Sequence, residues 1–196
     1  MRVVMATNNP NKLREAREIL APLGIEVISQ REAGADTDPE ENGATFADNA
    51  RIKAQAVYDI VHCPVIADDS GLCVDALGGA PGVHSARYAP KGQECEKLLA
   101  AMQEVPEGER RAYFRCTICY MDEKGSGTLS ADCVGRIGFA ARGVNGFGYD
   151  PVFEYGDRTL AEMTSEEKNA ISHRGAALRQ LYAVFRERYG ETNADK

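Results

Sequence analysis

Residues 3–28 read VVMATNNPNKLREAREILAPLGIEVI, and this stretch decides the class of fold. It opens with an apolar run at 3–6, which is typical of a short strand. A polar loop follows, and apolar residues then recur at helical spacing before a second strand-like run at 25–28. The residues at helical spacing are Leu13, Ala16, Leu20 and Leu23. A strand, a helix and a strand in this order predict an α/β start to the chain.

The next stretch combines a long loop with a helix. Residues 30–43 are polar and show no helical periodicity, so we expect a loop there. Thr45, with Asp48 three residues later, has the spacing of a capping box and predicts a helix through about Val61. The order of elements therefore continues to alternate.

The middle of the chain is rich in strand signals. Two short strands, 64–67 and 72–76, are expected on either side of a turn at Asp68-Asp69-Ser70-Gly71. Residues 111–121 alternate, turn at 124–127 and return through Val134, which predicts an antiparallel hairpin. A helix from Thr164 onward ends the chain. Its expected buried stripe consists of Leu178, Leu181, Tyr182 and Phe185. The class is therefore α/β or α+β with a mixed sheet.

Composition excludes several classes of protein. The 196 residues carry a formal net charge of -7, whereas proteins that bind nucleic acid usually present a basic stripe. No apolar run approaches the length of a membrane span, and the start of the chain lacks the apolar core of a signal peptide. Six scattered cysteines without an export signal favour free thiols in the cytoplasm. We expect one domain over residues 1–196, with a frayed tail at about 191–196.

One pair of cysteines, Cys116 and Cys119, has the spacing of zinc or redox sites. The pair lies in YFRCTICY, residues 113–120, whose β-branched and aromatic content is typical of a strand. An offset of three residues places the two thiols on opposite faces of a strand. Because no second pair completes a metal set, we interpret both as packing residues.

The loop of residues 7–12 offers a site for an anion. Asn9 suits the N-cap of the following helix, Pro10 suits its first position, and free backbone N–H groups there attract anions. A cation at Lys12 in the first turn opposes the helix dipole by about 0.3–1 kcal/mol unless a phosphate binds beside it. The alternative is a solvated lysine on an ordinary helix.

A second cation breaks an apolar stripe. Lys53 shares the inward face of its predicted helix with four apolar residues. These residues are Phe46, Ala50, Val57 and Ile60. An inward lysine needs an anionic partner, although snorkelling along the helix is the simpler alternative.

Acidic pairs suggest a metal. Glu40-Glu41 lies in the long loop and Asp68-Asp69 ends a strand. Carboxylate oxygens suit Mg²⁺, which usually takes one or two carboxylates and completes its shell with water and phosphate. Because neighbours in a strand point to opposite faces, only one of Asp68 and Asp69 reaches a given metal. The alternative is turn chemistry, since Asp-Ser-Gly is a common turn sequence.

The segment GVNGFGYDP, residues 143–151, combines glycines with a phenylalanine. Glycines permit a close backbone approach, and the Phe147 ring is available to stack on a base. The segment is neither a Walker loop nor a dinucleotide fingerprint, because the spacing differs. The alternative is an ordinary hairpin connection. Cationic phosphate contacts, carboxylates for a metal and an aromatic ring for a base together describe a nucleoside triphosphate site.

Seven ordered motifs make the chain resemble the inosine triphosphate pyrophosphatase family, also called the Ham1 family. The resemblance covers about Val3 to Leu181. Its motifs are Ala6-Thr7-Asn8-Asn9 through Lys12, Glu40 through Gly43 with Thr45-Phe46, Asn49-Ala50 with Lys53-Ala54, Ala67 through Leu72, Gly78 through Gly82 with Ser85 through Tyr88, Gly146 through Pro151, and Glu167-Lys168 with Ser172 through Gly175.

The resemblance implies a fold and a set of roles. It implies an elongated mixed sheet with flanking helices, two lobes around a central substrate cleft, and a homodimer. The residues implied to contact the triphosphate are Thr7, Asn8, Asn9, Pro10, Asn11, Lys12, Lys53 and Ser70. The residues implied to contact the base are Phe147, Gly148, Tyr149, Asp150, Lys168, His173 and Arg174. It further implies that Glu40 and Asp69 hold Mg²⁺ and that Asp69 is the general base.

The expected function is hydrolysis of non-canonical purine triphosphates to the monophosphate and pyrophosphate. Glu40 and Glu41 both fit the acidic position, and the three-residue step to Gly43 favours Glu40. Arg174 is expected to donate to the 6-oxo group of hypoxanthine or xanthine. Asp68 is expected to support or share the metal. The alternative class is a non-catalytic nucleotide-binding module, which has little use for acids beside a triphosphate.

Overall fold

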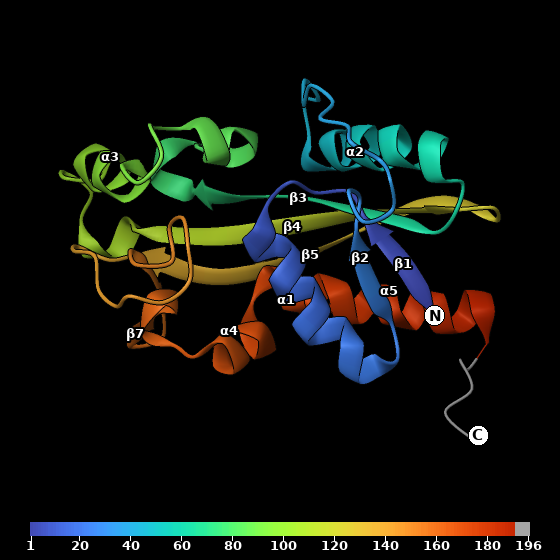
Figure 1. Cartoon of the computed structure of the whole chain (residues 1–196). Coiled ribbons are helices and arrows are strands. Elements are labelled where there is room, and N and C mark those ends of the chain that lie inside the picture. The colour runs from blue at the N-terminus through green and yellow to red at the C-terminus, as the bar shows by residue number, and fades with distance from the viewer. Residues whose placement is uncertain (191–196) are drawn as a thin grey trace. The chain divides into compact units, whose positions relative to one another are not determined.

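The computed structural model of the chain describes residues 1–190 (Figure 1). Its helices are α1 (Pro10–Leu20), α2 (Phe46–Val61), α3 (Glu94–Ala101), α4 (Ser165–Ile171) and α5 (His173–Tyr189). Its strands are β1 (Arg2–Met5), β2 (Glu26–Ser29), β3 (Val65–Val74), β4 (Arg111–Asp122), β5 (Gly125–Ile137), β6 (Phe153–Tyr155) and β7 (Arg158–Thr159). The expected frayed tail at 191–196 lies outside the described residues.

The strands form one mixed sheet in the order β2-β1-β3-β4-β5-β6-β7. β1 pairs in parallel with β2 and with β3, whereas β5, β6 and β7 pair antiparallel. β4 and β5 are neighbours separated by two residues, as the predicted hairpin requires. The α/β class with a mixed sheet and flanking helices is confirmed.

The chain divides into two compact units, each with its own core. Unit 1 consists of residues 1–69, 116–131 and 174–190 of the described chain, and unit 2 consists of residues 70–115 and 132–173. The core of unit 2 packs α3 against strand residues that include Leu72, Phe114 and Phe153. The substrate cleft that the resemblance implies stays a prediction.

Unit 1 buries both faces of its part of the sheet. Val3 and Met5 of β1 pack with α1 and α5, whereas their neighbour Val4 packs with α2. Ile66 of β3 belongs to the α1 and α5 side, and Val65 belongs to the α2 side. Figure 1 shows α2 on one side of β3 and α5 on the other. Strands covered on both faces need nearly continuous apolar sequence, which residues 3–6 and 65–67 provide.

Local sequence signals are confirmed at both helix starts. Asn9 caps α1 by accepting from the backbone N–H groups of Asn11 and Lys12 at 2.9 and 3.4 Å. Thr45 and Asp48 form the capping box of α2, which ends at Val61 as expected. Each cap satisfies N–H groups that have no partner within the helix.

Three expectations about secondary structure are wrong. Asp68 to Gly71 form no turn, because β3 runs without a break from Val65 to Val74 and burial favours the extended backbone over the local Asp-Ser-Gly preference. The single helix expected after Thr164 is two helices, since Ser172 has ψ 153° and ends α4. Ile60 is 51% exposed, so the inward stripe of α2 ends at Val57.

The cysteine interpretation is confirmed. All six cysteines are free thiols. Cys116 packs on the α1 and α5 side of β4, while Cys119 packs on the α2 side.

No helix among residues 1–190 has both the length and the apolar character needed to cross a bilayer. The cytoplasmic location and the homodimer stay predictions.

Candidate active site

β3 presents two adjacent carboxylates to opposite faces of the sheet. Asp68 faces the side of α1 and α5, where Lys12 and Arg174 contact it. Asp69 faces the side of α2, where Asn49 and Lys53 contact it. Both aspartates are buried, at 2% and 7% exposure. The alternation of a strand therefore assigns one carboxylate to each helical layer, as the sequence predicts.

Asp68 lies in a network of buried charges. Its Oδ2 is 3.2 Å from Lys12 Nζ and 3.0 Å from Arg174 Nε. Arg174 also pairs with Glu15 of α1, which is equally buried. Burial works against the Asp68 carboxylate, but Lys12, Arg174 and Lys53 outweigh it and hold the pKa of Asp68 well below its usual range. Asp68 stays ionised.

The loop of residues 7–12 differs from the expectation of free backbone N–H groups. Thr7 Oγ1 accepts from the Asn9 N–H at 3.1 Å, and the Asn9 cap takes the N–H groups of Asn11 and Lys12. Asn8 donates to Asp38 at 3.0 Å. The backbone N–H groups of Asn9, Asn11 and Lys12 therefore already have acceptors. The feature of this loop that suits a phosphate is the charge of Lys12.

Asp69 is held from α2 by two side chains one helical turn apart. Asn49 Nδ2 donates to Asp69 Oδ2 at 3.1 Å, and Lys53 Nζ lies 3.6 Å from Oδ1. Burial raises the pKa of Asp69, although Lys53, Lys12 and the Asn49 hydrogen bond act against this rise. The expectation that Lys53 is an inward lysine with anionic partners is confirmed. A carboxylate with a raised pKa is the better base of the two.

Of the two loop acids, the structure brings Glu41 to this group. Glu41 Oε2 lies 2.8 Å from Lys53 Nζ, so one ammonium lies within 3.6 Å of oxygens from Glu41 and Asp69. Glu40 is exposed. This contact does not test which acid binds a metal, so the preference for Glu40, which rested on its spacing from Gly43, stays a prediction. The loop follows no regular period, so a count of residues does not tell which of two neighbours faces inward.

The oxygens around Lys53 suit a hard cation. Glu41 and Asp69 together already attract one positive charge, and Asp68 Oδ1 is buried without a hydrogen-bond partner among the described residues. No group of three or more His, Cys, Asp or Glu side chains in residues 1–190 forms a metal site. Two carboxylates fit Mg²⁺, which completes its shell with water and phosphate oxygens, and do not fit a structural zinc.

A second group, in unit 2, is built around Asp150. Its Oδ2 accepts from the Phe147 backbone N–H at 2.8 Å and from Lys168 Nζ at 2.7 Å. The Lys168 ammonium lies 4.5 Å from the centre of the Phe147 ring, which is half-buried. Gly146 has φ 74°, and a Cβ there would come within 2.1 Å of Asp150 Oδ2. The glycine thus permits the turn that places the aromatic ring beside the lysine.

The remaining predicted base contacts surround this group or lie elsewhere. Tyr149 is buried and donates to the Ser85 carbonyl at 2.8 Å, while the Gly148 carbonyl accepts from Cys95. His173 stacks on Phe114 with ring centres 4.8 Å apart. Arg174 lies in unit 1 on Asp68 and Glu15, so its expected role in reading the base stays a prediction. Ser70 is half-buried in β3.

The site residues expected from the sequence do not include two members of the Asp68 and Asp69 groups, Glu15 and Asn49. Glu15 is 4% exposed and Asn49 is 1% exposed, although both are polar. Asn49 lies on the inward face of α2 with Phe46, Ala50 and Lys53, so its helical position was the available signal. Glu15 lies three residues after Lys12 and next to the buried Ala16, which offered a weaker signal.

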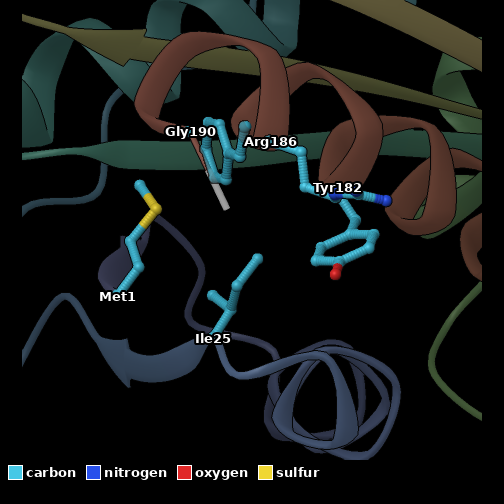
Figure 2. Close-up of a pocket in the computed structure, with 6 residues that line it drawn as sticks. Met1, Ile25, Tyr182, Arg186 and Gly190 are labelled. Atoms are coloured by element: carbon cyan, nitrogen blue, oxygen red, sulfur yellow. The ribbon is translucent and has the colours of Figure 1, made fainter. Parts of the chain in front are cut away.

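One hollow elsewhere in unit 1 carries no such chemistry. Figure 2 shows it between the start of the chain and α5. It is lined by Met1, Ile25, Tyr182, Phe185, Arg186 and Gly190. Its cavity of about 10 Å³ holds at most one water molecule, which excludes it as a nucleotide site.

Comparison with known proteins gives a consistent result. The model of the Ham1 family matches residues 3–184. A dITP/XTP pyrophosphatase of Erwinia tasmaniensis is 47% identical over 189 residues, which cover 91% of this chain and 91% of that protein. A dITP/XTP pyrophosphatase of Treponema denticola is 46% identical over 187 residues, covering 91% of this chain and 95% of that protein.

Solved structures agree with the sequence matches. The Staphylococcus aureus Ham1 protein superposes with a TM-score of 0.84 at 37% identity, covering 96% of this chain and 100% of that one. A HAM1 protein from Coxiella burnetii gives a TM-score of 0.83 at 43% identity, covering 95% and 99%. The similarity therefore extends over nearly the whole length of each chain.

The pKa of Asp68 predicts how stability depends on pH. Its value in the folded chain lies below that of an unfolded aspartate, which is about 3.9. The ionised carboxylate therefore stabilises the folded chain above that pH, and this contribution is lost as the pH falls through about 4 toward the folded value. We expect the free energy of unfolding in urea to fall more steeply with acidification in the wild type than in Asp68→Asn.

Asp75→Asn is the matched control for this measurement. Asp75 directly follows the same strand, but its carboxylate pairs with Arg111 at the surface. We expect this variant to keep the pH dependence of the wild type. Equal slopes for the wild type and Asp68→Asn between about pH 5 and pH 2 would contradict a stabilising Asp68 charge.

Proposed function

The chain belongs to the Ham1 family, and we propose that it hydrolyses non-canonical purine nucleoside triphosphates to the monophosphate and pyrophosphate. The names of its relatives support dITP and XTP as substrates. The observation that carries the reaction is the pair Asp68 and Asp69, whose surroundings move their pKa values in opposite directions. Such a pair separates a permanently charged carboxylate from one that can exchange a proton.

Asp69 is the general base of the proposed reaction. Cleavage between the α- and β-phosphates requires an in-line water and compensation of charge on the leaving pyrophosphate, with little covalent chemistry. Asp69 accepts the proton of the attacking water, and the Asn49 amide and the Lys53 ammonium hold its carboxylate in place for this role. Lys53 and Lys12 are the cations that offset phosphate charge, because each already contacts one of the two carboxylates.

Glu41 and Asp69 are the proposed ligands of Mg²⁺. Both contact the ammonium of Lys53, so their oxygens already stabilise positive charge at one place. When bound, Mg²⁺ supplies charge neutralisation and orientation for the phosphates. The magnesium requirement is inferred from the chemistry of these oxygens and from the family resemblance.

The group around Asp150 is the proposed contact for the base. The Phe147 ring offers a stacking face, and the Lys168 ammonium offers donors for the 6-oxo group of hypoxanthine and xanthine. Adenine carries an amino donor at that position and would leave such donors unpaired. Asp150 fixes the Lys168 side chain and the backbone of Phe147, because one of its oxygens accepts from both.

A product assay tests the proposed function directly. The protein is incubated with Mg²⁺ and separately with ITP, XTP, dITP, GTP and ATP, and the phosphorus products are identified by ³¹P NMR. We expect monophosphate and pyrophosphate, with the three non-canonical substrates preferred over ATP by about 10²-fold or more, since buried donors discriminate strongly. Release of orthophosphate and a nucleoside diphosphate would indicate a γ-phosphatase. Tight nucleotide binding without turnover would support a non-catalytic binding module.

Replacement of Asp69 tests its role as base. Asp69→Asn keeps the shape of the side chain but removes its charge and its basicity, so we expect kcat to fall by about 10²–10⁴-fold in a folded protein. Asp75→Asn, which changes an acid directly after the same strand, should keep the wild-type kcat. Near wild-type turnover of folded Asp69→Asn would assign the base to another residue.

Removal of divalent metal tests the proposed magnesium ligands. We expect excess EDTA to abolish turnover and added Mg²⁺ to restore it, because the available ligands are carboxylate oxygens. A zinc-selective chelator should have no effect, since all six cysteines are free and form no metal set. Turnover that persists in excess EDTA would exclude the metal from the mechanism.

A further inference from the structure

Asn49 is a fully buried amide that joins two parts of the Asp69 group. Its side chain lies on the inward face of α2, where it is 1% exposed. Its Nδ2 donates to Asp69 Oδ2 at 3.1 Å, and its Oδ1 accepts from the Gly43 backbone N–H at 2.8 Å. One side chain therefore connects the strand that carries Asp69 with the loop that carries Glu41.

The orientation of this amide is determined by its partners. The Asp69 carboxylate only accepts and the Gly43 backbone N–H only donates, so a flipped amide would lose both bonds. The contact with the loop is also close, because a Cβ on Gly43 would lie 2.7 Å from Asn49 Oδ1 and 2.6 Å from Asp48 Cβ. The loop can approach α2 this closely only with glycine at position 43.

Asn49 and Lys53 hold the same carboxylate from opposite oxygens. They lie four residues apart on one helical face, where Asn49 contacts Asp69 Oδ2 and Lys53 lies near Oδ1. Lys53 also pairs with Glu41 of the loop. Because a neutral amide adds no charge, Asn49 can fix Asp69 without competing for the cation that the oxygens attract.

We propose that Asn49 is a positioning residue for the reaction, which sets the rotation of the Asp69 carboxylate and the place of the Glu41 loop. This inference rests on the proposed function, since it takes Asp69 as base and metal ligand. Hydrogen-bond partners of metal ligands typically contribute about 10–100-fold in metal affinity or activity. The side chain is buried and bonds to Asp69 and to the Gly43 backbone, so we expect its effect on kcat and on metal affinity.

Two variants separate the two hydrogen bonds. Asn49→Ala removes both, whereas Asn49→Asp keeps an acceptor for the Gly43 N–H but replaces the donor to Asp69 with a like charge. Thr117→Val is the matched control, because Thr117 is buried at 2% exposure in the same unit and its hydroxyl lies 2.7 Å from the hydroxyl of Ser130. It removes a buried polar group without touching the Asp69 group.

Three measurements report on the proposal. We expect hydrogen exchange at residues 40–43 to rise in Asn49→Ala and to stay at the wild-type level in Asn49→Asp. We expect Mn²⁺ affinity, measured by EPR as a probe of the metal site, to fall by about 10–100-fold in Asn49→Ala. We expect kcat on dITP to fall by a similar factor in both variants with KM unchanged, while Thr117→Val keeps all three values.

Each result decides between the hypotheses. Wild-type kcat and Mn²⁺ affinity in a folded Asn49→Ala would overturn the proposal, and a raised KM with unchanged kcat would make Asn49 a substrate-binding residue instead. If the wild type turns over none of the triphosphates, the proposed function fails, and hydrogen exchange with Mn²⁺ affinity still decides the role of Asn49. If Asn49→Ala does not fold, Asn49→Asp and Gly43→Ala carry the same test.

Discussion

Side chains alternate between the two faces of a strand, and in β3 this alternation sends adjacent carboxylates into two different helical layers. Both faces of this part of the sheet are buried, so each carboxylate needs compensating groups from the layer it enters. Lys12 and Arg174 supply them for Asp68. Asn49 and Lys53 of α2 supply them for Asp69. The positions of three helices are thereby tied to one dipeptide.

The two compensations differ in kind, and the proposed chemistry depends on this difference. Two cations lie directly on Asp68, and a further buried carboxylate, Glu15, lies on one of them. Asp69 has one neutral amide and one more distant ammonium, which Glu41 shares. Replacing one partner in a buried ion network leaves an uncompensated charge, so the Asp68 side tolerates little change. The Asp69 side is the one on which we propose the proton transfer and the metal.

The sequence predicts those features of the fold that depend on local rules. The Asn9 cap, the capping box at Thr45 and the opposite faces of Cys116 and Cys119 follow from spacing alone, and the structure confirms each. The prediction of a turn at residues 68–71 was wrong, because Asp-Asp-Ser-Gly suits a turn in isolation but also a strand that is covered on both faces. Ser172 interrupts the last helix although no proline or glycine marks the break.

The candidate site shows the same division between local and tertiary information. Lys53 was found because a cation on an apolar helical stripe breaks a local rule, and Asn49 breaks the same rule at the neighbouring turn. Glu41 could not be separated from Glu40, because the loop has no period from which an inward face follows. The backbone of Gly43 does not have a positive φ, so no turn requires a glycine there. Glycine is required at this position because Asn49 approaches it closely. Gly43 therefore marks a packing contact between the loop and α2. A residue count from Gly43 does not predict which of the two acids reaches Lys53.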